Sequence, residues 1–256
     1  MIHKQDQSIG DLDTWLRLAG PKSAIQWKDG RSAKESAKAW LAAFPMIPAE
    51  ITETLVSHAD IDEFVEWQAE PEALVRFDSL RGEPSNLDVL LLGSDRHGPL
   101  VVAVEAKADE SFGGTIGETL RRAQARLDAS PNSKGVARVE ALAERLLGVP
   151  ATELESVADL RYQLITASAA ALSEAERRGV SRAIVLVHEF ITDLTTDKRH
   201  AANGKDLERF VTVLAGAPTT LHSGQMIGPF TVPRGGTPAS EPALYFGKVS
   251  VGLRGG

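Results

Sequence analysis

The 256-residue chain contains no cysteine, which excludes disulfides, thiol nucleophiles and cysteine-based zinc sites. It also lacks long apolar runs, because no stretch approaches the ~18 residues of a membrane span. The opening residues Met1-Ile2-His3-Lys4 do not begin an apolar leader segment. Hydrophobic residues make up 43% of the chain and charged residues 25%, as in ordinary globular proteins. We therefore expect a soluble, cytoplasmic protein without a membrane partner.

Several enzyme classes are excluded by motifs that the sequence does not contain. It has no Gly-x-x-x-x-Gly-Lys phosphate loop, no Gly-x-Gly-x-x-Gly fingerprint and no Gly-x-Ser-x-Gly elbow. The six histidines show neither His-x-His nor His-Glu-x-x-His spacing. Nucleotide-driven, dinucleotide-dependent, serine-hydrolase and zinc-hydrolase activities therefore have no support in the sequence.

The chain does have two charged side chains at the end of an apolar strand. Residues 99–104 are short, apolar and partly β-branched, which predicts a buried strand that ends in Glu105-Ala106-Lys107. Strand side chains alternate between faces, so Glu105 and Lys107 point the same way, with Cα atoms roughly 7 Å apart. Burying an unpaired ion costs several kcal/mol, so charges at this position indicate a partner or a function.

The order of predicted elements is helix, three strands, helices, strand. Residues 32–44 and 48–58 are predicted helices, followed by strands over 73–78, 87–92 and 99–107. Helices are predicted over 115–128, 137–147, 157–178 and about 206–214, and further strands over 182–190, 226–232 and 244–251. Consecutive short strands favour an antiparallel meander, and the strand after the long helix can join in parallel. The fold class is therefore α/β: a mixed sheet with helices on both sides, a helical insertion and C-terminal strands, in a single domain over 1–256.

Asp88 opens the second predicted strand, and Glu105 closes the third. If these strands pair, both carboxylates lie at one end of the sheet, where they form a typical ligand pair for Mg²⁺ or Mn²⁺. Such a cation polarises a phosphoryl oxygen and activates water, and Lys107 could orient or deprotonate that water or stabilise developing charge. The predicted chemistry is phosphodiester hydrolysis.

These residues resemble a known pattern. Asn86-Leu87-Asp88, sixteen intervening residues and Glu105-Ala106-Lys107 are similar to the active-site signature of the PD-(D/E)xK, or restriction-endonuclease-like, nuclease superfamily. The element order resembles that fold over a core of about 32–190, which leaves about 191–256 as a C-terminal extension. The resemblance implies a nuclease acting on DNA or RNA, with Asp88 and Glu105 as metal ligands and Lys107 as the catalytic lysine.

The resemblance has further implications and one departure. It implies another acid on the first helix, for which Glu35 is the candidate metal ligand, and many such nucleases form homodimers to cut both strands. Leu87 stands where the namesake motif has proline. The stretch Gly30-Arg31-Ser32-Ala33, together with the Glu105-Ala106-Lys107 run, also resembles uncharacterised bacterial members of this superfamily.

Several alternatives stay open at this point. Glu105 and Lys107 could form a salt bridge at the sheet rim, with Asp88 capping a turn. Glu35 also fits a capping box with Ser32. The chain could be a non-catalytic module of the same fold that binds nucleic acid or a protein.

Three further features carry the same kind of ambiguity. Gln163 and its neighbours Arg161 and Tyr162 could face the site or pack in the core, and His188 is expected to be a partnered core histidine. Net charge is −7, yet residues 119–145 hold six basic side chains against three acidic ones, either a solvated face or a nucleic-acid contact. The basic residues are Arg121, Arg122, Arg126, Lys134, Arg138 and Arg145.

Overall fold

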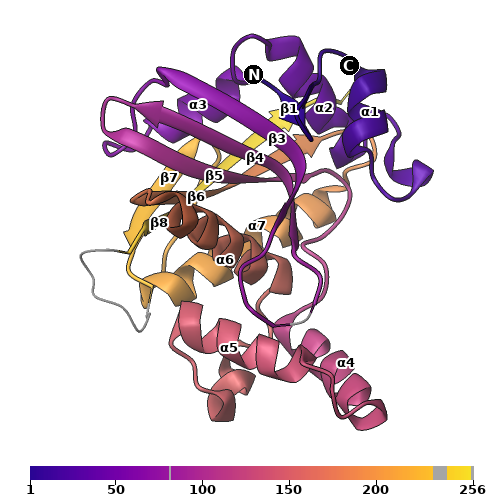
Figure 1. Cartoon of the computed structure of the whole chain (residues 1–256), viewed down its shortest axis with the longest axis vertical. Coiled ribbons are helices and arrows are strands. Elements are labelled where there is room, and N and C mark those ends of the chain that lie inside the picture. Colours follow the sequence, from indigo (N-terminus) through magenta and orange to yellow (C-terminus); the bar gives the residue numbers. More distant parts are fainter. Residues whose placement is uncertain (81, 233–240, 255–256) are drawn as a thin grey trace.

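A mixed sheet forms the centre of the computed structural model, which describes residues 1–80, 82–232 and 241–254 (Figure 1). Within those residues the sheet has six strands in the order β3-β4-β5-β6-β8-β7. The β3-β4-β5 meander and the β8-β7 pair are antiparallel, whereas β6 runs parallel to both β5 and β8. The strands are β3 (Glu66–Val75), β4 (Ser85–Asp95), β5 (Gly98–Lys107), β6 (Arg182–Ile191), β7 (Gln225–Phe230) and β8 (Ala243–Gly252). The predicted meander and the predicted parallel strand are both confirmed.

Helices cover both faces of this sheet. On one face, Val102 and Val104 of β5 share a buried cluster with Trp40. On the other, Val101 and Ala103 pack in a second cluster. The first face carries α1 (Leu12–Ala19), α2 (Ser32–Ala43) and α3 (Ala49–Val56), and the second carries α6 (Tyr162–Arg178) and α7 (Asp197–Ala215). The alternation along β5 decides where its charged end points: Glu105 and Lys107 continue the series of Val101 and Ala103, on the α6 face.

A helical lobe projects from the sheet between β5 and α6. It contains α4 (Ile116–Ala129), α5 (Gly135–Leu147) and the 3₁₀ segment η2 (Ala151–Val157), and it forms the lower end of the molecule in Figure 1. The short elements near the N-terminus are β1 (His3–Lys4), β2 (Gln7–Ser8) and η1 (Ala24–Gln26). Among the described helices, none is long and apolar enough to span a bilayer.

Element boundaries differ from the prediction where local sequence is a weak guide. Strand β3 begins at Glu66 rather than residue 73, because an edge strand tolerates the polar side chains and the proline of its first half. Helix α7 begins at Asp197 rather than near 206, since the Thr196 side chain caps it by accepting the Arg199 amide. Helix α6 begins at Tyr162 rather than 157, and the α1 helix was not predicted. The proposed C-terminal extension, 191–256, includes residues 233–240 and 255–256, which lie outside the described residues.

Candidate active site

Asp88 and Glu105 lie on neighbouring strands at one end of the sheet. The last register pair of β4 and β5 joins Val89 to Val104, so Asp88 and Glu105 are opposite one another one residue further on. There the Asp88 Oδ2 atom accepts the Ala106 amide hydrogen bond at 2.7 Å. Asp88 thus satisfies a backbone donor of the neighbouring strand and remains only half-buried. This geometry agrees with the prediction that Asp88 and Glu105 lie at the same end of two paired strands.

Glu105 and Lys107 are almost wholly enclosed. The Glu105 residue is 1% exposed and Lys107 is 3% exposed, which is less accessible than a rim position would be. The Lys107 Nζ atom lies 3.6 Å from Glu105 Oε2 and donates to the Ala106 carbonyl at 3.0 Å. The Gln163 amide of α6 donates to the same Glu105 oxygen at 2.6 Å. Gln163 therefore covers Glu105 on the side away from the sheet.

A third carboxylate, from Glu72 of β3, completes a row across three strands. Its neighbours Pro71 and Ala73 pair with Val89 and Leu87, so Glu72 is opposite Asp88. Glu72 has φ of +50°, a left-handed conformation that costs energy in a residue with a side chain. Its carboxylate accepts a hydrogen bond from the Asn86 amide. The sequence analysis missed Glu72 because the beginning of β3 was not predicted as strand.

Burial, with a smaller contribution from neighbouring acids, raises the pKa values of all three carboxyl groups. Burial, and then the charge of Asp88, raises the pKa of Glu105 to about 8, although Lys107 opposes this. Burial also raises the pKa of Asp88, against the lowering effects of Lys107 and the Ala106 amide. The pKa of Glu72 is raised by burial and by Asp88. Burial alone would lower the pKa of Lys107, but Glu105 and Asp88 outweigh it and raise that pKa, so Lys107 is a cation at neutral pH.

The other end of the same sheet shows what a structural salt bridge looks like in this protein. Asp95 of β4 forms two 2.7 Å hydrogen bonds to the Arg182 guanidinium, and both residues are buried. Burial would raise the pKa of Asp95, but the hydrogen bonds of Arg182 and of backbone amides lower it to about 2. One acid is matched there by one bidentate cation. At the Glu105 end, the charge of Lys107 acts on both Asp88 and Glu105, and Glu110 adds a further negative charge, so the acids there are not matched one to one.

The donor set fits a hard divalent cation. Oxygen ligands from carboxylates are what Mg²⁺ and Mn²⁺ bind, and an added positive charge would offset the raised pKa values of Asp88 and Glu105. In the arrangement observed, however, no three Asp, Glu or His side chains of the described chain already converge in metal-binding geometry. The residues that could hold the ion are therefore Asp88 and Glu105, with Glu72 beside them, after Gln163 releases the Glu105 oxygen.

Glu35, the third predicted ligand, is not brought to these acids by its observed contacts. It lies near the start of α2, a helix that packs through Trp40 on the opposite face of the sheet from Glu105. The Glu35 carboxylate accepts the Gly30 amide at 2.7 Å and contacts the Lys38 ammonium at 2.9 Å. The alternative capping box with Ser32 is wrong, because the helix begins one residue earlier, with Arg31 as N-cap and no side-chain capping bond.

A surface cleft leads to the outer side of Gln163. It has a volume of about 240 Å³ and lies between the start of β4, α5 and the first turn of α6. Its lining includes Asn86, which contacts Glu72, and Gln163, which contacts Glu105. Arg138 and Tyr162 form another part of its wall. Gln163 thus separates Glu105 from this cleft, whereas Asp88 and Glu72 are partly exposed.

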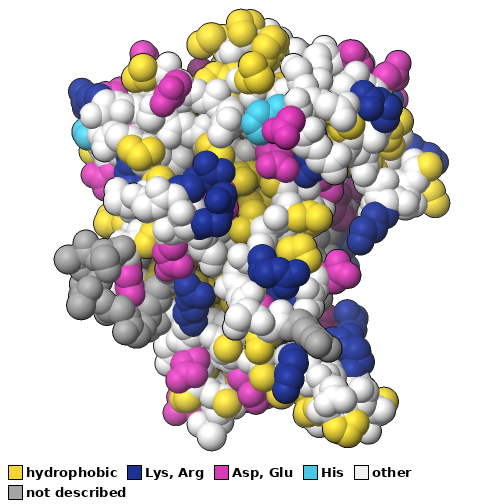
Figure 2. All heavy atoms as spheres, in the orientation of Figure 1, with side chains coloured by type: hydrophobic (Ala, Val, Ile, Leu, Met, Phe, Trp, Pro, Cys, Tyr) yellow, Lys and Arg dark blue, Asp and Glu magenta, His cyan; other side chains and the backbone are white. Residues whose placement is uncertain are grey.

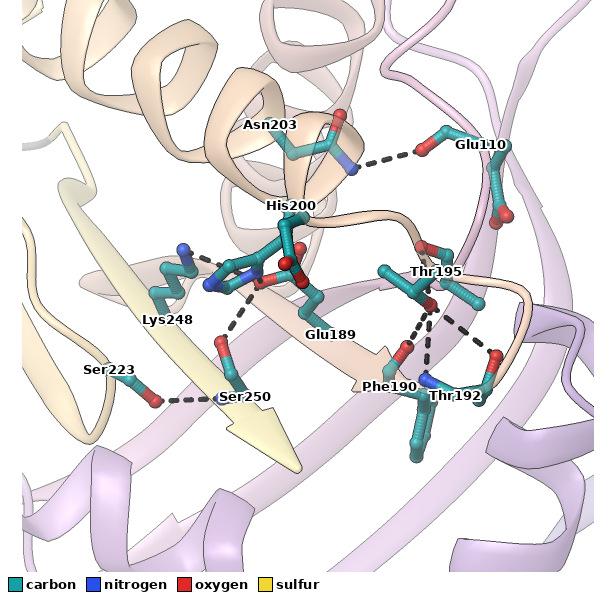
Figure 3. Close-up of polar contacts among 12 residues, drawn as sticks. Glu110, Glu189, Phe190, Thr192, Thr195, His200, Asn203, Ser223, Lys248 and Ser250 are labelled. Carbon is teal, nitrogen blue, oxygen red and sulfur yellow. Dashed lines mark hydrogen bonds and ion pairs between the residues drawn. The ribbon is translucent and has the colours of Figure 1, made fainter. Parts of the chain in front are cut away.

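A second polar cluster lies beside Lys107 on the next strand, β6 (Figure 3). Glu189, opposite Lys107 in the register, is fully buried, and its Oε2 atom contacts His200 at 2.9 Å and Lys248 at 3.4 Å. The Ser250 hydroxyl donates to the same oxygen at 2.9 Å. This network fastens α7 to β6 and β8. Sequence reasoning missed it, since its members are spread over 61 residues and meet only through the parallel pairing of β6 and β8.

The structure shows the contacts of three further residues that the sequence singled out. Gln163 does face the site, whereas Arg161 pairs with Asp206 at 2.8 Å and donates to the Gly113 carbonyl. His188 is fully buried and contacts Glu50 of α3 at 3.1 Å, as expected of a partnered core histidine.

Comparison with known proteins gives a family but no activity. Residues 8–251 match the family model described as a domain of unknown function, DUF6946. The comparisons with curated proteins and with solved structures found no match.

Proposed function

The chain belongs to the DUF6946 family, whose description assigns no chemistry, and we propose from the site that it is a divalent-metal-dependent phosphodiester hydrolase acting on DNA or RNA. One observation carries the proposal: Asp88 and Glu105 lie opposite one another on β4 and β5, Glu72 lies beside Asp88 on β3, and the Lys107 nitrogen is 3.6 Å from Glu105. The resemblance to PD-(D/E)xK nucleases in the motif and in the order of elements supports the same conclusion.

Each residue has a defined part in this proposal. Asp88 and Glu105 would hold Mg²⁺ or Mn²⁺, which when bound supplies Lewis-acid polarisation of a phosphoryl oxygen and a more acidic water. Lys107 remains protonated because its pKa is raised, so it serves as a fixed positive charge for the developing phosphorane rather than as a base. Phe112, whose ring centre lies 5.3 Å from the Lys107 nitrogen, helps to exclude water around that charge.

Gln163 is the residue that must move for this chemistry. Its amide occupies the Glu105 oxygen, and both Glu105 and Lys107 are enclosed in the observed arrangement. This enclosure is the specific observation that favours a second candidate, a non-catalytic module of the same fold that binds nucleic acid or a protein. The two candidates differ in metal binding: a saturable Mn²⁺ heat that depends on Glu105 supports the hydrolase, and its absence supports the binding module.

The test of activity is nucleic-acid cleavage by the purified full chain. Fluorescent DNA and RNA are incubated with Mg²⁺ or Mn²⁺, and cleavage should stop on adding EDTA and fall at least 100-fold in Lys107→Ala. Lys248→Ala is the matched control, because Lys248 is also a nearly buried lysine paired with a glutamate on a neighbouring strand. The control should retain cleavage. Undiminished cleavage by a Glu105→Ala/Lys107→Ala double variant would exclude this site.

A further inference from the structure

The α4 helix carries exposed arginines that have no acidic partner in the described chain. Of the six basic residues predicted to form a patch over 119–145, Arg138 and Arg145 are paired, with Asp78 at 2.6 Å and Glu176 at 3.1 Å. The side chains of Arg121, Arg122 and Arg126 are exposed, and none forms an ion pair with any residue that the structure describes. Lys134, between α4 and α5, is exposed and likewise unpaired within the described ranges.

These charges are unusual in a chain of net charge −7, where excess acid could have neutralised them. Figure 2 shows that Lys and Arg side chains of the lower lobe gather on the side where α4 lies. Arg122 and Arg126 are one helical turn apart, which places their Cβ atoms about 6 Å from each other on one face. A row of unpaired guanidinium groups at this spacing suits a chain of phosphates, which arginine binds with directed N–H donors.

The arginines are connected to the candidate active site by short, contiguous contacts. The start of α4 is fixed to the start of α6 by the Thr115–Arg161 bridge and by the Tyr162 amide, which donates to the Gly114 carbonyl at 3.0 Å. Arg122 extends back over Gly114: a Cβ placed on that glycine would lie 3.5 Å from the Arg122 Nη1 atom. Tyr162 is followed by Gln163, which covers Glu105.

The cleft joins the two regions. Arg138 and Tyr162 line it together with Gln163. Arg126 reaches the start of α5, because a Cβ placed on Gly135 would lie 3.5 Å from the Arg126 Nη2 atom, about one turn before Arg138. Arg126 therefore connects the exposed side of α4 to the α5 wall of the cleft, where Arg138 itself is paired with Asp78.

We propose that Arg122 and Arg126, which share one exposed face of α4, together with the exposed Arg121 beside them, bind the sugar-phosphate backbone of a nucleic acid that enters the cleft at Arg138. This inference rests on the proposed function, because it names the surface that holds the substrate of that site. Backbone phosphates are common to DNA and RNA, so the surface sets affinity and register but does not read sequence.

The test is direct binding, measured without cleavage. Fluorescence anisotropy in EDTA uses the full chain and three labelled 20-residue probes of one sequence: single-stranded DNA, duplex DNA and single-stranded RNA. The Arg121→Gln/Arg122→Gln/Arg126→Gln variant should bind its preferred probe at least tenfold more weakly at low salt. The slope of log binding constant against log salt concentration should decrease in magnitude by about 2 to 3, because each lost phosphate contact means that just under one counterion fewer is released on binding.

A matched control removes the same charge elsewhere. Arg96, Arg177 and Arg209 are also exposed arginines, but each is paired, with Asp62, Glu174 and Asp159 respectively. Replacing these three with glutamine should change affinity less than twofold.

The outcomes separate this surface from the hydrolase proposal. Equal loss of affinity in the two triple variants, or no binding of any probe by the wild type, would overturn the α4 surface. Loss of binding confined to the α4 variant would support it, even if Lys107→Ala showed that the site does not cleave.

Discussion

Replacing Glu105 with glutamine should make the protein more stable at neutral and mildly alkaline pH. The folded protein keeps the Glu105 proton until about pH 8, whereas the unfolded chain loses it near 4.5. Between these values the folded state binds more protons than the unfolded state, so the free energy of unfolding decreases as pH rises. Glu105→Gln mimics the protonated acid at every pH and does not lose this stability.

The size of this change in the free energy of unfolding follows from the pH range between the unfolded and folded pKa values of Glu105. A single proton changes stability by about 1.4 kcal/mol per pH unit, which gives an upper limit of roughly 4 kcal/mol between pH 5 and 8. Asp88 and Lys107 share the same enclosure, so their charges adjust to the substitution and reduce the observed difference. We expect the stability of Glu105→Gln relative to wild type to increase by about 2 to 4 kcal/mol over this range.

The assay is urea unfolding of both proteins at pH 5, 6, 7 and 8. Glu174→Gln is the control, since Glu174 is also buried but its pKa is lowered: burial would raise it, and hydrogen bonds from Arg177 and Arg178 prevail. The stability that ionised Glu174 contributes is present above its unfolded pKa and is lost only in acid. The free energy of unfolding of Glu174→Gln should therefore differ from that of the wild type by a constant amount from pH 5 to 8. A Glu105→Gln difference that does not change with pH would refute the raised pKa of Glu105.

Three more expectations concern neighbouring residues. Asp95→Asn should cost about 3–5 kcal/mol in urea unfolding, because it leaves Arg182 buried without its partner; a cost near zero would contradict that role. Glu35→Gln should leave the calorimetric Mn²⁺ heat unchanged, and loss of that heat would place Glu35 in the metal site after all. Gln163→Ala should tighten Mn²⁺ binding by uncovering the Glu105 oxygen, and weaker binding would instead make Gln163 a support of the site.

Sequence reasoning located the central strands well, because hydrophobic periodicity reports directly on buried strands. The apolar run before Glu105 and the alternation across β4 were enough to place Asp88 and Glu105 as neighbours. The same reasoning missed Glu72, since the polar, proline-containing start of β3 has no strand-like pattern. It also left open whether Gln163 faces the site, because Gln163 and Glu105 are 58 residues apart and no local pattern encodes their contact.

Glu35 is a residue that the sequence proposed for the site but whose observed contacts lie elsewhere. Its position on the first long helix fits the resemblance, and the sequence could not tell which face of the sheet that helix covers. Packing of Trp40 with Val102 and Val104 settles the face, and the Glu35 carboxylate is engaged with Gly30 and Lys38. The Glu189 cluster could not be predicted from the sequence for a related reason. It depends on the strand order, in which β8 lies between β6 and β7.

The most direct measurement is a crystal of the full chain soaked in Mn²⁺ and recorded at the manganese absorption edge. The proposed function predicts an anomalous peak bonded to carboxylate oxygens of both Asp88 and Glu105, with the Gln163 amide displaced from Glu105. A saturating soak that leaves Gln163 on Glu105 and gives no peak between the two acids would contradict it.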